Sequence, residues 1–90
     1  MMTEIIWDAG FKRGYKKRIS PYPILLKKFE DALNIFLINP FDSRLKTHKL
    51  SGDLKDCWSL SVDFDVRLIF KFISSNLVML IDIGSHEEVY

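Results

Sequence analysis

The chain has few cysteines and prolines and no long hydrophobic run. It contains one cysteine, three prolines and four glycines among 90 residues. The single Cys57 cannot form an internal disulfide, so a secreted domain held by disulfides is excluded and a reducing compartment is favoured. The longest segments without a charged side chain, residues 32–41 and 72–81, have ten residues each, whereas a membrane helix needs about 20. We therefore expect a cytoplasmic protein without a membrane partner.

The chain also has little excess charge of either sign. Thirteen Lys and Arg residues face twelve Asp and Glu residues, which gives a net charge of +1. A protein that binds nucleic acid mainly through its overall charge would be more basic. Hydrophobic residues make up 48% of the sequence, which excludes a disordered chain and is sufficient for one domain over residues 1–90.

The two signs of charge are separated along the chain. Residues 1–49 hold ten basic and five acidic side chains, and residues 50–90 hold three basic and seven acidic ones. Five of the cations lie within residues 12–18. This pattern has two interpretations. It fits a solvated helix face and an acidic sheet edge, and it fits equally well a local basic patch that binds an anion.

A first strand at residues 4–7 and two helices are expected in the N-terminal half. Asp8 is a suitable N-cap for the first helix, whose apolar positions repeat every four residues from Phe11. The second helix is predicted to begin at Ser20-Pro21, a cap followed by a first-turn proline, and to end at the Asn-Pro pair of residues 39–40.

Most of the remaining sequence alternates apolar and polar residues with a period of two, as a half-buried sheet does. Strands are predicted over residues 58–63, 66–73 and 77–83, with a tight turn at residues 74–76 and a short edge strand within residues 45–50. Helices followed by a meander indicate an α+β single domain, with two N-terminal helices packed on one face of a twisted antiparallel sheet.

Two cations fall on the sheet face that no helix is expected to cover. Arg67 and Lys71 alternate with apolar residues of their strand and therefore project away from the core. Arg67 is either solvated or paired with a carboxylate such as Asp63 or Asp82, or it contacts an anion, since guanidinium matches phosphate in a bidentate fork.

Two histidines and a terminal aromatic are further candidates. His86 directly follows the last predicted strand, and histidine side chains exchange protons near neutral pH. His48 lies between Lys46 and Lys49, in a basic loop suited to a phosphate backbone. Tyr90 either seals the core edge or stacks on a base. With one cysteine, the two histidines do not complete a structural zinc site, and no Gly-rich phosphate loop is present, so no metal or cofactor is expected.

Five sequence blocks in register resemble the RelE/ParE toxin superfamily, the last of them its YafQ-like and RelE/StbE-like mRNA interferases. The blocks are NPFD at residues 39–42, LKTHKLSG at 45–52, WSLSV at 58–62, DVRLIF at 65–70 and LIDIGSHEEVY at 80–90. The resemblance implies the toxin of a type II toxin–antitoxin pair, with two helices backing a twisted antiparallel sheet. It further implies an enzyme that enters the A site of the 70S ribosome and cuts mRNA without a metal. The 2′-OH of the substrate then attacks the adjacent phosphate to give a 2′,3′-cyclic phosphate.

The same resemblance implies roles for individual residues. His86 matches the general acid for the leaving 5′-oxygen, and Arg67 matches the arginine that stabilises the transition-state charge. His48, with Lys46 and Lys49, would orient the phosphate or accept the 2′-OH proton. Tyr90 would stack on a nucleotide, and Lys71, on the face of Arg67, is a further RNA-binding candidate. The implied partners are a cognate antitoxin, in a hetero-oligomer, and the ribosome with its mRNA.

Two positions depart from the YafQ-like pattern and leave alternatives open. Ser61 stands where such toxins have a further histidine, and Asp82 stands where they have an arginine. The chain is therefore also compatible with a ParE-like inhibitor of DNA gyrase that cuts no RNA. A third alternative is a degenerate toxin that only binds its antitoxin.

Overall fold

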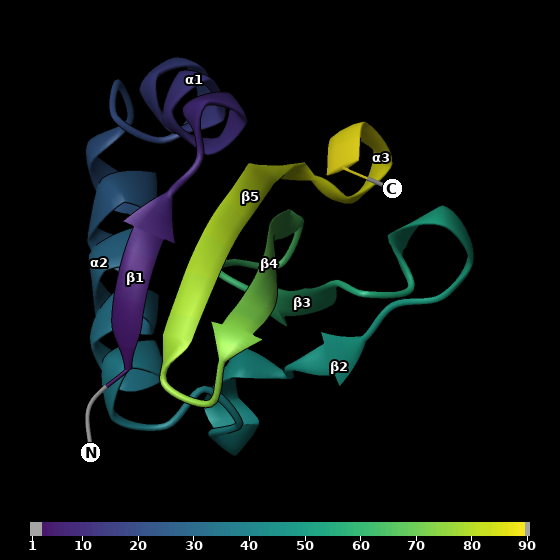
Figure 1. The fold of residues 1–90 in the computed structure, drawn as a ribbon. Coiled ribbons are helices and arrows are strands. Elements are labelled where there is room, and N and C mark those ends of the chain that lie inside the picture. The colour runs from purple at the N-terminus through teal and green to yellow at the C-terminus, as the bar shows by residue number, and fades with distance from the viewer. Residues whose placement is uncertain (1–2, 90) are drawn as a thin grey trace.

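The computed structural model describes residues 3–89 and shows a five-stranded sheet backed by two helices (Figure 1). The helices are α1 (Ala9–Arg18), α2 (Pro23–Ile38) and the short α3 (His86–Val89), with 3-10 turns η1 (Ser43–Leu45) and η2 (Gly52–Leu54). The strands are β1 (Glu4–Trp7), β2 (His48–Lys49), β3 (Trp58–Ser61), β4 (Val66–Ser74) and β5 (Leu77–Ser85). The predicted α+β class is confirmed.

The sheet is mixed, although most of it is antiparallel as predicted. Its strand order is β1-β5-β4-β3-β2, and the strands from β2 to β5 pair antiparallel with their neighbours. Strand β1 instead runs parallel to β5, with Ile5 opposite Val78 and Trp7 opposite Leu80. A hairpin turn makes its two strands antiparallel, but β1 is connected onward through two helices. Its direction is therefore set by packing and not by a local turn.

Helix α1 begins where the sequence predicts. The Asp8 carboxylate accepts a hydrogen bond of 2.9 Å from the backbone N–H of Gly10, which satisfies one of the donors at the helix start. Phe11 lies fully buried on the inner face of the helix. Its ring packs edge-on against Trp7 of β1 and lies beside Phe29 of α2, so an aromatic cluster joins three elements.

Helix α2 begins later than predicted. Its first residue is Pro23, and its N-cap is Tyr22, whose side chain makes no capping hydrogen bond. The predicted start at Ser20-Pro21 is wrong because Tyr22 precedes a proline, which disfavours helical backbone at that position. Tyr22 accordingly has φ −116° and ψ 103°, an extended conformation that separates the two helices. The predicted end is confirmed, with Asn39 as C-cap.

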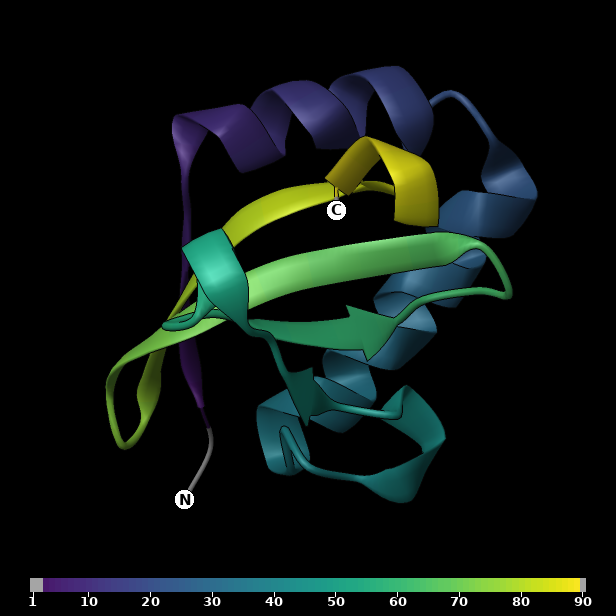
Figure 2. The ribbon, with the colours of Figure 1, turned by 90° about the vertical axis from the view of Figure 1, so that its right-hand side faces the viewer.

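The core lies between the helices and one face of the sheet. Its members from α1, α2, β3, β4 and β5 form one cluster, which includes Phe11, Phe29, Phe36, Leu60, Leu68, Phe70, Val78, Leu80 and Ile83. The opposite sheet face is more covered than predicted, because Ile69 and its cross-strand partner Ser59 are also buried there. Helix α3 packs against β4 and β5 (Figure 2). Within residues 3–89, no helix is long and apolar enough to cross a membrane.

Gly14 sets the distance between α1 and the sheet. A β-carbon at this position would lie 3.0 Å from the carbonyl oxygen of Ile83 and 3.3 Å from its Cγ2 atom. The helix therefore rests directly on the backbone of β5. Glycine lowers the intrinsic stability of a helix, so at this position the close packing compensates for a weak helix former.

We predict that Gly14→Val destabilises the fold by about 1–3 kcal/mol, because the added atoms force α1 away from β5. The matched control is Lys12→Val, which brings the same β-branched residue into the same helix at an exposed position. Urea unfolding followed by circular dichroism measures both variants. Equal stabilities of the two variants would show that the contact with Ile83 does not limit the packing.

Candidate functional site

An open cleft of about 650 Å³ lies where β3 ends, β4 begins and α3 follows β5. Its lining comes from the η1 region, the turn between β3 and β4, and the start of α3. The lining residues are Arg44, Lys46, Ser61, Val62, Asp63, Phe64, Asp65, Arg67, His86 and Glu87. Three cations and three carboxylates surround the single histidine, so the cleft is polar and its charges are balanced.

The cleft brings together three of the predicted site residues, Lys46, Arg67 and His86. His48 and Lys49 form the edge strand β2, with His48 opposite Ser59, and neither lies in the lining. Lys71 lies further along β4, also outside the lining. None of these three residues therefore lines the cleft. The predicted Tyr90 lies outside the described residues.

His86 is placed by the pairing of the two longest strands. In the β4–β5 ladder, Val66 lies opposite Ser85 and Arg67 lies opposite Gly84. The backbone N–H of His86 then donates a hydrogen bond of 3.2 Å to the carbonyl oxygen of Asp65. The exposed His86 side chain thus begins α3 at the same end of the sheet as Arg67.

Arg67 binds backbone carbonyls in the free chain. Its Nη1 atom donates to the carbonyl oxygens of Asp63 at 2.9 Å and Phe64 at 3.0 Å. The Asp63 carboxylate is bound instead by Lys28 of α2 at 2.8 Å, and this hydrogen bond lowers the pKa of Asp63 below its ordinary value. Arg67 therefore stiffens the β3–β4 turn.

Asp82 does not enter the cleft lining. Its carboxylate accepts a hydrogen bond of 2.8 Å from the backbone N–H of Ile83, on its own strand. Its cross-strand neighbour is Ile69. Asp82, which departs from the pattern that the resemblance implies, therefore adds no carboxylate to the lining.

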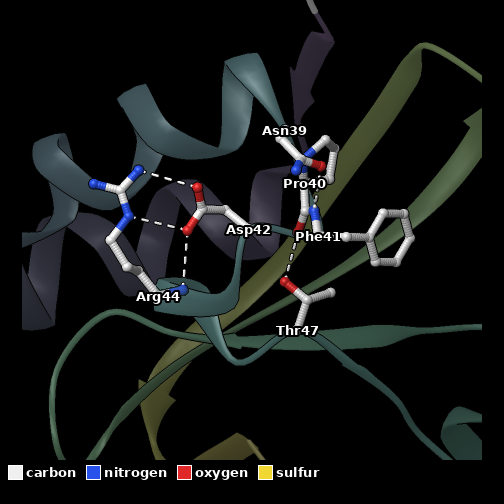
Figure 3. Close-up of polar contacts among 6 residues, drawn as sticks. All are labelled: Asn39, Pro40, Phe41, Asp42, Arg44 and Thr47. Atoms are coloured by element: carbon white, nitrogen blue, oxygen red, sulfur yellow. Dashed lines mark hydrogen bonds and ion pairs between the residues drawn. The ribbon is translucent and has the colours of Figure 1, made fainter.

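Arg44 is a cation of the cleft that the sequence alone does not identify. Figure 3 shows its guanidinium bound in a fork to Asp42, with Nε 3.0 Å from one carboxylate oxygen and Nη2 3.0 Å from the other. The same carboxylate caps η1 by accepting from the backbone N–H of Arg44 at 3.0 Å. These hydrogen bonds lower the pKa of Asp42 to about 2.

The segment that carries Arg44 is held by its own side chains. The Asn39 side chain accepts a hydrogen bond of 3.0 Å from the backbone N–H of Phe41, and the Thr47 hydroxyl donates to the Pro40 carbonyl oxygen at 2.6 Å (Figure 3). Lys46 takes a left-handed conformation with φ 53°, which ends the 3-10 turn. The segment thereby presents Arg44 and Lys46 to the cleft from one side.

We predict that the Asp42 carboxyl titrates at about 2 in the folded chain, below its ordinary value of 3.8, because Arg44 binds its charged form. Since the folded-state pKa is the lower one, the stabilisation by this pair is complete above the unfolded-state value. It is lost as the pH falls from 3.8 towards about 2. Carbon NMR of the side-chain carboxyl measures the midpoint. Arg44→Gln raises it, whereas the remote Arg13→Gln leaves it unchanged; an equal midpoint in both variants would contradict the assignment.

Comparison with known proteins identifies the fold. The chain is similar to YafQ from E. coli strain BL21(DE3), with a TM-score of 0.77, 19% identity and 98% of each chain covered. It is similar to YafQ in the E. coli DinJ-YafQ toxin-antitoxin complex, with a TM-score of 0.76, 19% identity, and 100% and 99% of the two chains covered. A metal-bound toxin from Helicobacter pylori is 26% identical, with a TM-score of 0.71 and both chains fully covered. A sequence comparison with curated proteins finds no match.

These similarities define a RelE/YafQ-like fold, in which the polar cleft lies at the end of the sheet. The profile of the family described as "Bacterial toxin of type II toxin-antitoxin system, YafQ" matches residues 3–90. The chain belongs to this family. The family resemblance of the sequence blocks is therefore confirmed.

Proposed function

We propose that the chain is a ribosome-dependent endoribonuclease that cuts translated mRNA without a metal cofactor. The observation that carries this proposal is the cleft, which places His86, Arg67 and Lys46 around one open space. Family membership supports it, because the chain is a toxin of a type II toxin-antitoxin system. Each of these three residues comes from a different segment of the chain.

In the proposed reaction, the 2′-oxygen of one nucleotide attacks the adjacent phosphorus while the bond to the 5′-oxygen of the next nucleotide breaks. The products are a 2′,3′-cyclic phosphate and a free 5′-OH end. His86 donates the proton that the leaving 5′-oxygen requires, because histidine exchanges protons near neutral pH and this side chain is exposed in the cleft.

The negative charge that develops on the phosphate requires fixed cations. Lys46 and Arg67 both line the cleft, Lys46 from the segment before β2 and Arg67 from β4. One nitrogen of Arg67 is engaged with the turn, which fixes the orientation of the guanidinium plane. Arg44 adds a third cation: its Nε and Nη2 atoms hold Asp42, and its Nη1 atom is available to a phosphate oxygen.

The proton of the attacking 2′-OH requires an acceptor, and His48 is our candidate. It lies on β2 beside the cleft, and its Nδ1 atom is 3.1 Å from the carbonyl oxygen of Lys46. Lys49 and Lys71, which lie outside the described lining, and Tyr90 remain proposed RNA-binding residues. They would contact the RNA strand where it leaves the cleft.

An antitoxin protein is the second proposed partner. YafQ from E. coli has been crystallised in a toxin-antitoxin complex with DinJ, and its fold is similar to that of this chain. We propose that an antitoxin binds the first helix and the sheet edge, in a hetero-oligomer. The basic cluster at residues 12–18 of α1 favours an acidic segment in that partner.

We predict that His86→Ala lowers mRNA cleavage by roughly 10²–10⁴-fold, the contribution of a positioned proton donor. Primer extension on mRNA after induced expression measures cleavage, and circular dichroism verifies the fold. His48→Ala is expected to cause a smaller loss, because His48 lies outside the lining. Asn34→Ala, at an exposed position on α2, is the control and retains full activity.

Strong growth arrest with intact transcripts would contradict the proposed cleavage. A gyrase supercoiling assay with the purified protein then tests the ParE-like alternative. Full cleavage by His86→Ala would refute the role of His86 and leave the cleavage itself standing.

A further inference from the structure

Phe64 is the most exposed large hydrophobic side chain among the described residues, with 93% of its surface in solvent. It lies in the turn between β3 and β4 and lines the cleft. Single apolar side chains on a surface need no functional explanation. Phe64 differs because the other side chains of its cleft are mostly charged or polar.

The turn that carries Phe64 is fixed from two sides. On one side, Arg67 donates hydrogen bonds to the carbonyl oxygens of Asp63 and Phe64 at 2.9 and 3.0 Å. On the other side, Lys28 of α2 binds the Asp63 carboxylate at 2.8 Å. The backbone N–H of Val66 also donates to the Asp63 carbonyl oxygen at 3.3 Å. The backbone beneath Phe64 is therefore ordered before any ligand binds, which lowers the entropic cost of binding.

An aromatic face beside cations matches the chemistry of a nucleotide. A base stacks on the ring, and the phosphate next to it binds guanidinium or ammonium groups. Arg44 and Lys46 supply these groups in the same cleft. A protein partner would be expected to need further apolar contacts, and Val62 is the other large apolar residue in the described lining. The composition of the cleft therefore favours RNA.

We propose that Phe64 is a stacking platform for a nucleobase of single-stranded RNA, adjacent to the phosphate that Arg44 and Lys46 bind. This inference rests on the proposed endoribonuclease function and adds a substrate-binding residue to it. Every base has an aromatic face, so the platform contributes affinity and position and adds little sequence preference. Purines, which have the larger faces, bind more tightly.

The direct test is a titration of the wild-type chain with a short oligoadenylate whose 2′-oxygens are methylated, so that it cannot be cleaved. Carbon-labelled phenylalanine rings are observed by NMR, and the dissociation constant is measured by fluorescence anisotropy of an end-labelled oligonucleotide. We expect the Phe64 ring resonances to move upfield, because a stacked base shields them. Unmoved Phe64 resonances, or no measurable binding, overturn the proposal.

Variants separate stacking from simple apolar contact. Phe64→Ala is expected to weaken oligonucleotide binding roughly 5- to 150-fold, the range of alanine substitutions at base-stacking residues. Phe64→Trp retains the affinity, whereas Phe64→Leu loses it, because leucine is apolar but has no aromatic face. The control is Ile24→Ala, which truncates a side chain that is 74% exposed on α2 and leaves the affinity unchanged. Wild-type affinity of Phe64→Leu for the oligonucleotide shows that no aromatic face is required and overturns the proposal.

Cleavage of unmethylated mRNA on ribosomes is measured in parallel. Intact cleavage together with unchanged binding by Phe64→Ala overturns the stacking role alone. Binding through Phe64 by a chain that cuts no mRNA overturns the endoribonuclease function alone and supports the platform.

Discussion

The pairing of β4 with β5 is the interaction on which the rest of the structure depends. The two strands have nine residues each and pair from Val66 opposite Ser85 to Ser74 opposite Leu77. Strand β1 adds to the other edge of β5, and β3 adds to the other edge of β4. Helix α1 rests on the backbone of β5 at Gly14. The register of this one ladder therefore sets the position of α1 and of the cleft.

Where neighbours in the chain are also neighbours in space, the sequence predicts the fold well. The meander and the start of α1 follow from alternation, spacing and the Asp8 cap. The start of α2 depends on a finer constraint, because two prolines both suit a first helical turn and the extended Tyr22 decides between them. The direction of β1 cannot be predicted from local sequence, because its partner β5 lies some 70 residues further along the chain.

The candidate site is predictable to the extent that it depends on strand ends. His86 and Arg67 follow from the end of β5 and the start of β4, and Lys46 follows from the basic loop. The hydrogen bonds of Arg67 cannot be predicted in this way, because their acceptors are backbone carbonyl oxygens, which every residue has. Arg44 lies only two residues after Asp42, so the sequence indicates a local ion pair and not a residue of the cleft. The exposure of Phe64 depends on how the β3–β4 turn is anchored. These features are properties of three-dimensional geometry, and composition does not contain them.

The position of His86 has a further consequence. It directly follows a central strand that is hydrogen-bonded on both edges, and its own N–H is bound to Asp65. The loss of backbone freedom needed to position this residue occurs when the chain folds, before the proposed RNA substrate enters the cleft. In the proposed reaction, the energy of RNA binding is then available for orienting the RNA strand, because the backbone of the histidine is already in place.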